Sequence, residues 1–309
     1  MSKTYIGERT SMWLPLAILG HLLNALVYLI DRAFVVKFYP SPKALAFISG
    51  ASGVFLFFAF PWFPKSASAD VALAGIVSGL ISVPALVYFF RAMQQDEVSR
   101  VVPAVGSMIP LFTFGLSYWI LAERLESVSF SAFILLALGG VLIAFHSFEV
   151  RFLRRAYGLF FLEFFVALLF SLTFVLQKYA FDGTDDFSAF LWSRIGAVGA
   201  ALPLLLSKEV REKMRFSELR GGGIKRSALF MVSRIFAGIS PLIILLAIAF
   251  GSATLVNSIQ GLQYGFLFLL ALLFSRRWPE IFGEEISKSV LVQKSIATAL
   301  IIAGLALLV

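Results

Sequence analysis

The chain has 309 residues, of which 60% are hydrophobic and only 14% are charged, and its mean hydropathy is +0.91. Soluble domains carry about 25% charged residues, so this composition excludes an ordinary water-soluble fold, and the apolar excess excludes a disordered chain. The net charge of +8 lies largely in short loops between apolar segments, where Lys and Arg orient membrane helices, so we expect no nucleic-acid partner. The absence of Cys excludes disulfides and thiolate sites. The two histidines are too far apart in sequence to indicate a metal centre, and we expect no cofactor.

Ten apolar segments follow one another along the chain, each with about the 20 residues that a spanning helix needs. They are Ser11–Ile30, Ala44–Phe63, Asp70–Phe90, Val98–Leu121, Val128–Phe148, Ala156–Gln177, Phe187–Ser207, Lys225–Phe250, Ser252–Ser275 and Ser289–Val309. The polar stretch Met1–Thr10 has no small-residue cleavage site, so we expect the first segment to be retained. The sequence therefore predicts an all-α polytopic membrane protein with ten transmembrane helices.

The two halves of the chain are similar at a shift of 155 residues. The shift places Ala92 on Ala247, Val101 on Val256, Gly106 on Gly261 and Pro110 on Gly265. A unit of five helices crosses the membrane an odd number of times, so two tandem units lie in opposite orientations. We therefore predict two inverted five-helix repeats, residues 1–150 and 151–309, with a substrate site between them near the middle of the membrane.

Residues 90–145 carry five sequence features in a characteristic order. They are Ala92, Val102-Pro103, Pro110-Leu111, the turn Glu123-Arg124-Leu125, and Gly139-Gly140-Val141. With these features the chain resembles the EamA-type domain of the drug/metabolite transporter superfamily. The resemblance implies an export or exchange carrier of the inner or plasma membrane, with ten helices in two inverted repeats. It covers nearly the whole chain in layout, but in the second half Ser275-Arg276-Arg277-Trp278 and a longer loop replace the acidic turn.

Lys and Arg are distributed unequally between the two sides of the predicted helices. The side of the N-terminus carries 5 of them, the opposite side carries 18, and Arg194, Arg234 and Lys294 lie inside predicted spans. The positive-inside rule places the side with 18 in the cytoplasm and both termini outside it. Relatives in the family that the chain resembles are thought to have cytoplasmic termini; our prediction follows the charges of this chain.

Three charged residues lie deep within the sixth, seventh and eighth predicted helices. Arg194 and Arg234 fall near the middles of the seventh and eighth helices, and Glu163 lies in the first half of the sixth. A charge at the bilayer centre costs at least about 2.5–3.5 kcal/mol, so each needs a partner or a wet cavity. We interpret Arg194 and Arg234 as substrate-binding, because the Arg donor fork suits a carboxylate. Alternatively, Glu163 pairs with one Arg and carbonyls or water satisfy the other. Because burial favours a protonated carboxyl group, Glu163 is also a candidate for proton coupling.

The ninth predicted helix carries Asn257, Gln260 and Tyr264 on one face, with Gln263 beside them. Polar side chains at membrane depth must face protein or water. We interpret Asn257, Gln260 and Tyr264 as substrate-binding residues. The alternative is that they hold neighbouring helices together, as amide and hydroxyl groups commonly do in membrane bundles.

The first predicted helix has a similar stripe of His21, Asn24 and Tyr28. Asn24 and Tyr28 are candidates for substrate binding, and His21 is a candidate for proton coupling, since its intrinsic pKa lies near neutral pH. Alternatively, His21 is an ordinary hydrogen-bonded packing residue. Pro110 and Gly265 occupy equivalent positions of the two halves, and we interpret them as hinges; the alternative is a static kink.

The predicted function is that of a secondary carrier for a small polar metabolite, such as an amino acid or an organic anion. It would work by alternating access, with a proton or a counter-substrate as coupling partner and membrane lipid around it. The stretch Gly221-Gly222-Gly223-Ile224-Lys225 lacks the spacing of a phosphate-binding loop, so we do not expect ATP to drive transport. Two alternatives remain: a translocase of a lipid or lipid-linked headgroup on the same fold, and an intramembrane enzyme, which is less favoured because the spans lack a catalytic motif.

Overall fold

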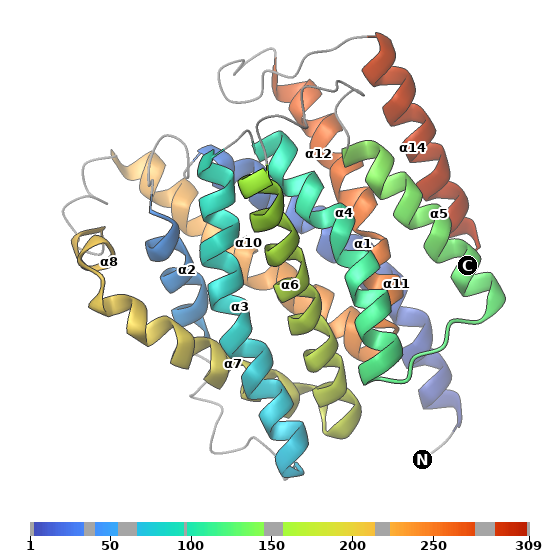
Figure 1. Cartoon of the computed structure of the whole chain (residues 1–309), viewed down its shortest axis with the longest axis horizontal. Helices are drawn as coiled ribbons and strands as arrows, with labels where there is room; N and C mark the ends of the chain where they lie inside the picture. The colour runs from blue at the N-terminus through green and yellow to red at the C-terminus, as the bar shows by residue number, and fades with distance from the viewer. Residues whose placement is uncertain are drawn as a thin grey trace.

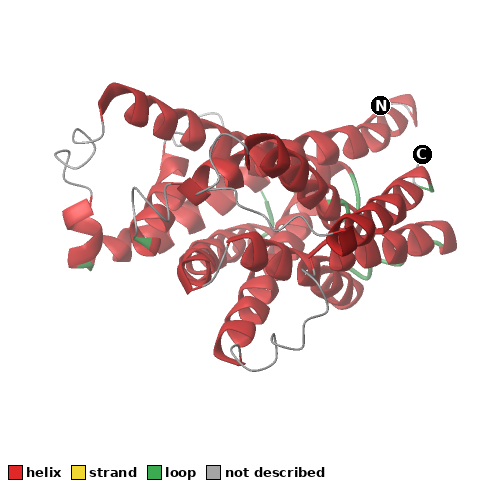
Figure 2. Ribbon diagram, turned by 90° about the horizontal axis from the view of Figure 1, so that it is seen from above, coloured by secondary structure: helices red, strands yellow, loops and turns green. Residues whose placement is uncertain are grey.

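The described part of the chain is built from helices alone. The computed structural model describes residues 3–33, 41–54, 67–95, 98–144, 157–213, 223–275 and 288–307, and every regular element in these ranges is a helix (Figures 1 and 2). The start of α1 and the end of α14 lie on the same side of the molecule in both views. The predicted all-α class is confirmed for this part of the chain.

Each of the ten predicted apolar segments contains a helix. In the first half these are α1 (Lys3–Ala33), α2 (Pro42–Ala51), α3 (Ala69–Gln95), α4 (Val98–Ile120) and α5 (Ser127–Ala144). In the second half they are α6 (Tyr157–Gly183), α7 (Asp186–Ala201) with the 3-10 helix η4 (Leu202–Leu206), α10 (Gly223–Phe250), α11 (Ala253–Ser258), α12 (Gln260–Ser275) and α14 (Lys288–Ala306). The short helix α8 (Lys208–Lys213) follows η4 and has the charged sequence KEVREK.

Three of the helical stretches are long and apolar enough to cross a membrane. They are Ala69–Gln95, Gly158–Gly183 and Asp186–Leu206. Shorter apolar helices lie at Met12–Tyr28, Ala104–Ile120, Ser127–Leu142, Ile235–Phe250 and Ser295–Ala306. The second predicted segment is described only as far as Val54.

Two helices begin at a serine that caps the first turn. The Ser41 hydroxyl accepts a hydrogen bond from Ala44 N at 3.2 Å at the start of α2, where Pro42 supplies a residue that needs no intrahelical donor bond. The Ser252 hydroxyl accepts a hydrogen bond from Leu255 N at 3.0 Å at the start of α11. Both serines satisfy backbone N–H groups that have no partner within the helix.

The ninth predicted helix is divided into α11 and α12. Ile259 N donates to Leu255 O at 3.3 Å, and Leu262 N then donates to Ile259 O at 2.9 Å, which is a bond across three residues instead of four. This tighter turn interrupts the α-helical ladder at Ile259. The interruption therefore falls before Gly261 and Gly265, in a stretch with neither Gly nor Pro.

Glycines hold α3 tightly against α7. A Cβ atom on Gly79 would lie 1.9 Å from Ser193 O, and one on Gly196 would lie 1.9 Å from Ile76 O. Only glycine fits at either position, because the two backbones are in contact. Small residues allow such close approach between membrane helices, so α3 and α7 form one of the tightest interfaces of the molecule.

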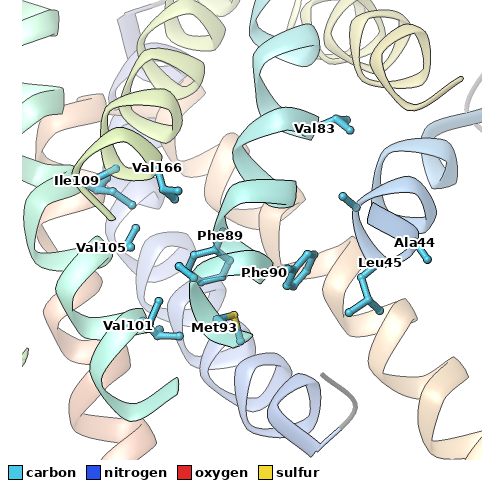
Figure 3. Packing of buried hydrophobic residues seen from close by; sticks show 14 of the residues in the cluster. Ala44, Leu45, Val83, Phe89, Phe90, Met93, Val101, Val105, Ile109 and Val166 are labelled. Carbon is cyan, nitrogen blue, oxygen red and sulfur yellow. The ribbon is translucent and has the colours of Figure 1, made fainter. Parts of the chain in front are cut away.

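A large apolar cluster fills the space between α2, α3, α4 and α6. Figure 3 shows Phe89 of α3 on the side of α4, near Val105, and the neighbouring Phe90 on the side of α2, near Leu45. Phe89 also meets Phe170 of α6 edge to face, with 5.8 Å between ring centroids. The cluster thus ties α3 to three other helices and supports the polar region described next.

Candidate binding site

A buried hydrogen-bond network joins α1 to α10, α11 and α12. His21 Nε2 lies 3.0 Å from Val256 O, and His21 Nδ1 lies 3.3 Å from Gln263 Oε1. Asn24 Nδ2 donates to the same Gln263 Oε1 at 3.1 Å, and Ser240 Oγ donates to Asn24 Oδ1 at 3.2 Å. His21 and Gln263 are 2% and 0% exposed. The network therefore brings the polar stripe of the first helix to the ninth predicted helix.

A second polar group lies where α12 meets α4. A Cβ atom on Gly106 would lie 1.2 Å from Tyr264 Oη and 3.1 Å from Gln260 Nε2. Tyr264 is 3% exposed and Gln260 is 7% exposed. The space at Gly106 thus accommodates two of the side chains that the sequence predicted to bind substrate, and it does so only because position 106 has no side chain.

Several buried polar atoms around these groups lack a hydrogen-bond partner. They are Gln260 Oε1, Gln263 Nε2 and Tyr264 Oη on α12; Thr113 Oγ1 and Ser117 Oγ, further along α4 than Gly106, also lack a partner. Buried polar groups are nearly always paired in folded proteins, and leaving one unpaired costs about 1–3 kcal/mol. Unpaired donors and acceptors on α12 and α4 are the arrangement expected where a polar ligand binds.

The remaining candidates on α1 and α11 lie beside this region. Tyr28 is half-buried, and its ring centroid lies 5.8 Å from that of Phe89 on α3. Asn257 is buried, but its Nδ2 donates to Ala253 O at 2.9 Å within α11. Asn257 therefore hydrogen-bonds within its own helix, whereas Asn24 hydrogen-bonds to residues of two other helices.

Arg194 lies apart from the His21 network. It belongs to α7, which packs chiefly on α3 and α2. Its guanidinium carbon lies 4.8 Å from the centroid of the Phe190 ring, and its Cδ would lie 3.0 Å from a Cβ on Gly53. The Arg194 Nε is buried without a hydrogen-bond partner. A desolvated cation over an aromatic ring is stabilised by the ring quadrupole, and the Arg194 Nε–H can still donate to an acceptor.

Of the other predicted site residues, the structure describes Glu163, Pro110 and Gly265, but not the side chain of Arg234. Glu163 is 4% exposed on α6. Arg234 belongs to α10, and its side chain lies outside the described residues. Pro110 is buried within an unbroken α4, and Gly265 lies in α12 after the interruption at Ile259.

The acidic turn after α4 contacts the second half of the chain directly. Glu123 accepts hydrogen bonds from the hydroxyls of Ser252 and Thr254, the latter at 3.3 Å. The turn is shaped by Ala122, whose φ of 52° is rare for a residue with a side chain. The Arg124 guanidinium lies 3.5 Å above the Tyr118 ring. Glu123 therefore fixes the start of α11, and through it the position of the polar network.

Gly106 and Ser240 were not identified as site residues from the sequence, although Gly106 was named as the counterpart of Gly261, and Gln263 was placed only beside the polar stripe. The i, i+3, i+7 spacing identified His21, Asn24, Gln260 and Tyr264, because that spacing defines one helix face. A glycine that receives a tyrosine hydroxyl from another helix carries no such local signal. Within the described residues, no group of His, Asp and Glu is arranged to hold a metal ion.

The comparisons with known proteins bear on the fold alone. No protein-family model and no curated protein matches the sequence. A protein of known crystal structure is similar to the chain with a TM-score of 0.60 and 16% sequence identity, over 99% of this chain and 97% of that chain. At this identity the likeness extends to the overall arrangement of the helices.

Proposed function

We propose that the protein is a secondary carrier for a small polar metabolite, an amino acid or an organic anion, and that it lies in the cell membrane as ten spans. The observation that carries the proposal is the group of buried, unpaired polar atoms on Gln260, Gln263 and Tyr264, at a junction of helices from both halves. Such a site suits reversible binding of a polar molecule, because a ligand can pair with groups that otherwise remain unsatisfied.

The packing of the helices supports the inverted-repeat arrangement of the drug/metabolite transporter superfamily. If the fifth helix after each helix of the first half is its counterpart, α1 corresponds to α6 and α3 to α10. The counterpart of the α3–α6 contact is then the α10–α1 contact, and both are among the most extensive of the described residues. Two repeats related by a twofold axis must make such exchanged contacts.

The contact between α5 and α14 supports the same twofold relation between the two halves, at the level of individual residues. A Cβ on Gly139 would lie 2.7 Å from Ile301 Cγ1 and 2.9 Å from Ala297 O. A Cβ on Gly304 would lie 2.7 Å from Leu136 Cγ and 3.1 Å from Ala132 O. A shift of 165 residues takes Gly139 to Gly304, Leu136 to Ile301 and Ala132 to Ala297. Each contact is thus the exchanged copy of the other, as expected for counterpart helices that cross on a twofold axis.

Other exchanged contacts are unequal, which supports alternating access. Within the described residues, α3 packs closely on α7, whereas its counterpart α10 makes only slight contact with Pro42–Ala51 of α2. α12 packs on α5, where Gly261 approaches Gly140 closely, but within the described residues α4 makes no comparable contact with α14. In an inverted-repeat carrier, a contact that is extensive in one half and slight in the other half defines one of the two conformations of alternating access. Exchanging the extensive and the slight contact between the halves gives the other conformation.

Counterflow in proteoliposomes tests this function. The purified protein is loaded with one member of a panel of amino acids, sugars and organic acids, and uptake of the labelled compound is followed. We expect exchange of one chemical class and a loss of about tenfold or more in Gln263→Ala. Thr173→Ala is the matched control, because the Thr173 hydroxyl bonds only to Leu169 O of its own helix at 3.0 Å. Exchange of no panel member, or equal activity of the two variants, would contradict the proposal.

A further inference from the structure

The two ring nitrogens of His21 both face oxygen acceptors. Nε2 lies 3.0 Å from the backbone carbonyl of Val256, and Nδ1 lies 3.3 Å from Gln263 Oε1. A neutral imidazole carries one N–H donor and one acceptor, whereas the charged imidazolium carries two donors. In this arrangement both contacts are hydrogen bonds only when His21 is protonated.

A neutral His21 forms hydrogen bonds through both ring nitrogens only in a different arrangement of the same side chains. If the Gln263 and Asn24 amides both rotate by half a turn, Gln263 Nε2 donates to His21 Nδ1 and to Asn24 Oδ1, and Asn24 Nδ2 donates to Ser240 Oγ. Oxygen and nitrogen of an amide have nearly the same size, so the rotation needs no movement of the helices. Protonation of His21 therefore decides which atom of Gln263 faces the imidazole and which faces away from it.

The outward atom of Gln263 is the one that has no partner. With His21 charged, this atom is Nε2, a buried donor without a hydrogen bond on a residue that is 0% exposed. With His21 neutral, an acceptor oxygen occupies the same position. A carboxylate is attracted by the first arrangement, which offers a donor beside a positive charge, and repelled by the second.

We propose that His21, Gln263 and Asn24 form a proton-linked binding site for the carboxylate of the substrate, in which one proton and one carboxylate bind together. This inference rests on the proposed carrier function and names its substrate class and coupling ion. The bound pair has no net charge, which lowers the cost of holding either charge within a membrane protein. The Gln263 amide transmits the coupling, because it presents a donor to the substrate only when His21 holds the proton.

The surroundings of His21 place few other titratable groups against it. Tyr28 of α1 is hydrogen-bonded to Asn24 of the network, and Tyr264 of α12 follows Gln263 and lies near Tyr28. α10 and α11 approach the network with Ser240 and the Val256 carbonyl, which do not titrate. Among the described side chains, no hydrogen bond or ion pair joins His21 to a charged group.

Nitrogen-15 NMR of the full chain in lipid nanodiscs tests the proposal. The chain has two histidines, so His146→Gln leaves His21 as the single imidazole signal. Acetate, pyruvate and succinate are the probes, each at about 100 mM, with acetamide as an uncharged match for acetate and sodium chloride at equal ionic strength. We expect at least one carboxylate to move the midpoint of the His21 titration upward by about one pH unit, which corresponds to a tenfold preference of the carboxylate for charged His21.

Two variants make the result specific to Gln263. In Gln263→Leu we expect no carboxylate-dependent change of the His21 titration. In Gln263→Glu the fixed carboxylate should keep His21 charged at neutral pH without any added probe. The proposal is overturned if none of the three carboxylates moves the titration, or if acetamide or chloride moves it equally.

Counterflow by the His146→Gln protein separates this inference from the proposed function. Transport without any carboxylate-dependent titration of His21 would overturn the inference and leave the carrier function standing. Titration without transport of any panel compound would support the carboxylate site and contradict the carrier function.

Discussion

At the scale of single residues, the polar network shows which of its members could be predicted from their spacing along a helix. The i, i+3, i+7 pattern predicted that His21 and Asn24 share a face, and the structure places both against Gln263. The partner was not predictable, because residues 21 and 263 belong to different halves and meet only through the fold. Arg194 was predicted as a site residue from its charge alone, and charge does not indicate which helices surround a residue. The structure places Arg194 on α7 beside Gly53, which follows α2.

Gly106 offers a direct test of the site. In Gly106→Ala the new methyl group would lie 1.2 Å from Tyr264 Oη, so the phenol must move away from α4. We expect the affinity for substrate to fall by about tenfold, since the displaced phenol can no longer hydrogen-bond to the ligand, and the loss of one such bond costs about 1–3 kcal/mol. Gly115→Ala in the same helix is the control, because a Cβ there would have nothing within 4 Å. Equal substrate affinity in the two variants would show that Tyr264 takes no part in binding.

Glu123 is expected to act on stability. In Glu123→Ala, the hydroxyls of Ser252 and Thr254 lose their acceptor, and we expect a loss of about 1–3 kcal/mol, measured as a lower thermal unfolding temperature in detergent. The exposed Glu126 in the same turn provides the matched control, Glu126→Ala. If both variants unfold at the temperature of the parent protein, the turn does not anchor α11.

At the scale of helices, the composition predicted where helices occur more successfully than where a helix is interrupted. Long apolar stretches identified α3, α6 and α7 without difficulty, because length and hydropathy are local properties of the chain. The interruption at Ile259 was not predictable, since Gly and Pro, the residues that usually signal a break, are absent between Ser252 and Gln260. The segment before the break, α11, packs on α4 and α5, and such contacts between distant parts of the chain leave no local signal in the sequence.

The α3–α7 interface gives a prediction at this scale. In Gly196→Ala the methyl group would lie 1.9 Å from Ile76 O, a backbone atom that cannot turn aside, so we expect a clear loss of folded protein on size-exclusion chromatography. Gly199→Ala, one helical turn further along, would meet only Leu80 Cδ2 at 3.8 Å and should behave like the parent. Normal folding of Gly196→Ala would show that α3 and α7 are not held in backbone contact.

At the scale of the whole molecule, orientation in the membrane follows from charge. The excess of Lys and Arg on one side predicts that both termini are extracytoplasmic. An alkaline phosphatase fused to the C-terminus should therefore be active, and a green fluorescent protein at the same place should be dark. Fluorescence of the C-terminal fusion would place the C-terminus in the cytoplasm and contradict the predicted orientation.

The central claim is that two inverted halves exchange their contacts during transport, and cross-linking tests it most directly. The native chain lacks Cys, so Leu80→Cys with Gly199→Cys introduces a single pair across α3 and α7, where Leu80 Cδ2 lies 3.8 Å from the position of a Gly199 Cβ. Leu136→Cys with Gly304→Cys is the control across α5 and α14, whose contacts are already equivalent and should persist in both states.

The decisive measurement is counterflow before and after joining each pair with a short, reducible bis-methanethiosulfonate. We predict that the cross-link between α3 and α7 abolishes exchange, that reduction restores it, and that the cross-link between α5 and α14 leaves it intact. Full exchange by a protein whose α3 and α7 are joined would contradict the account.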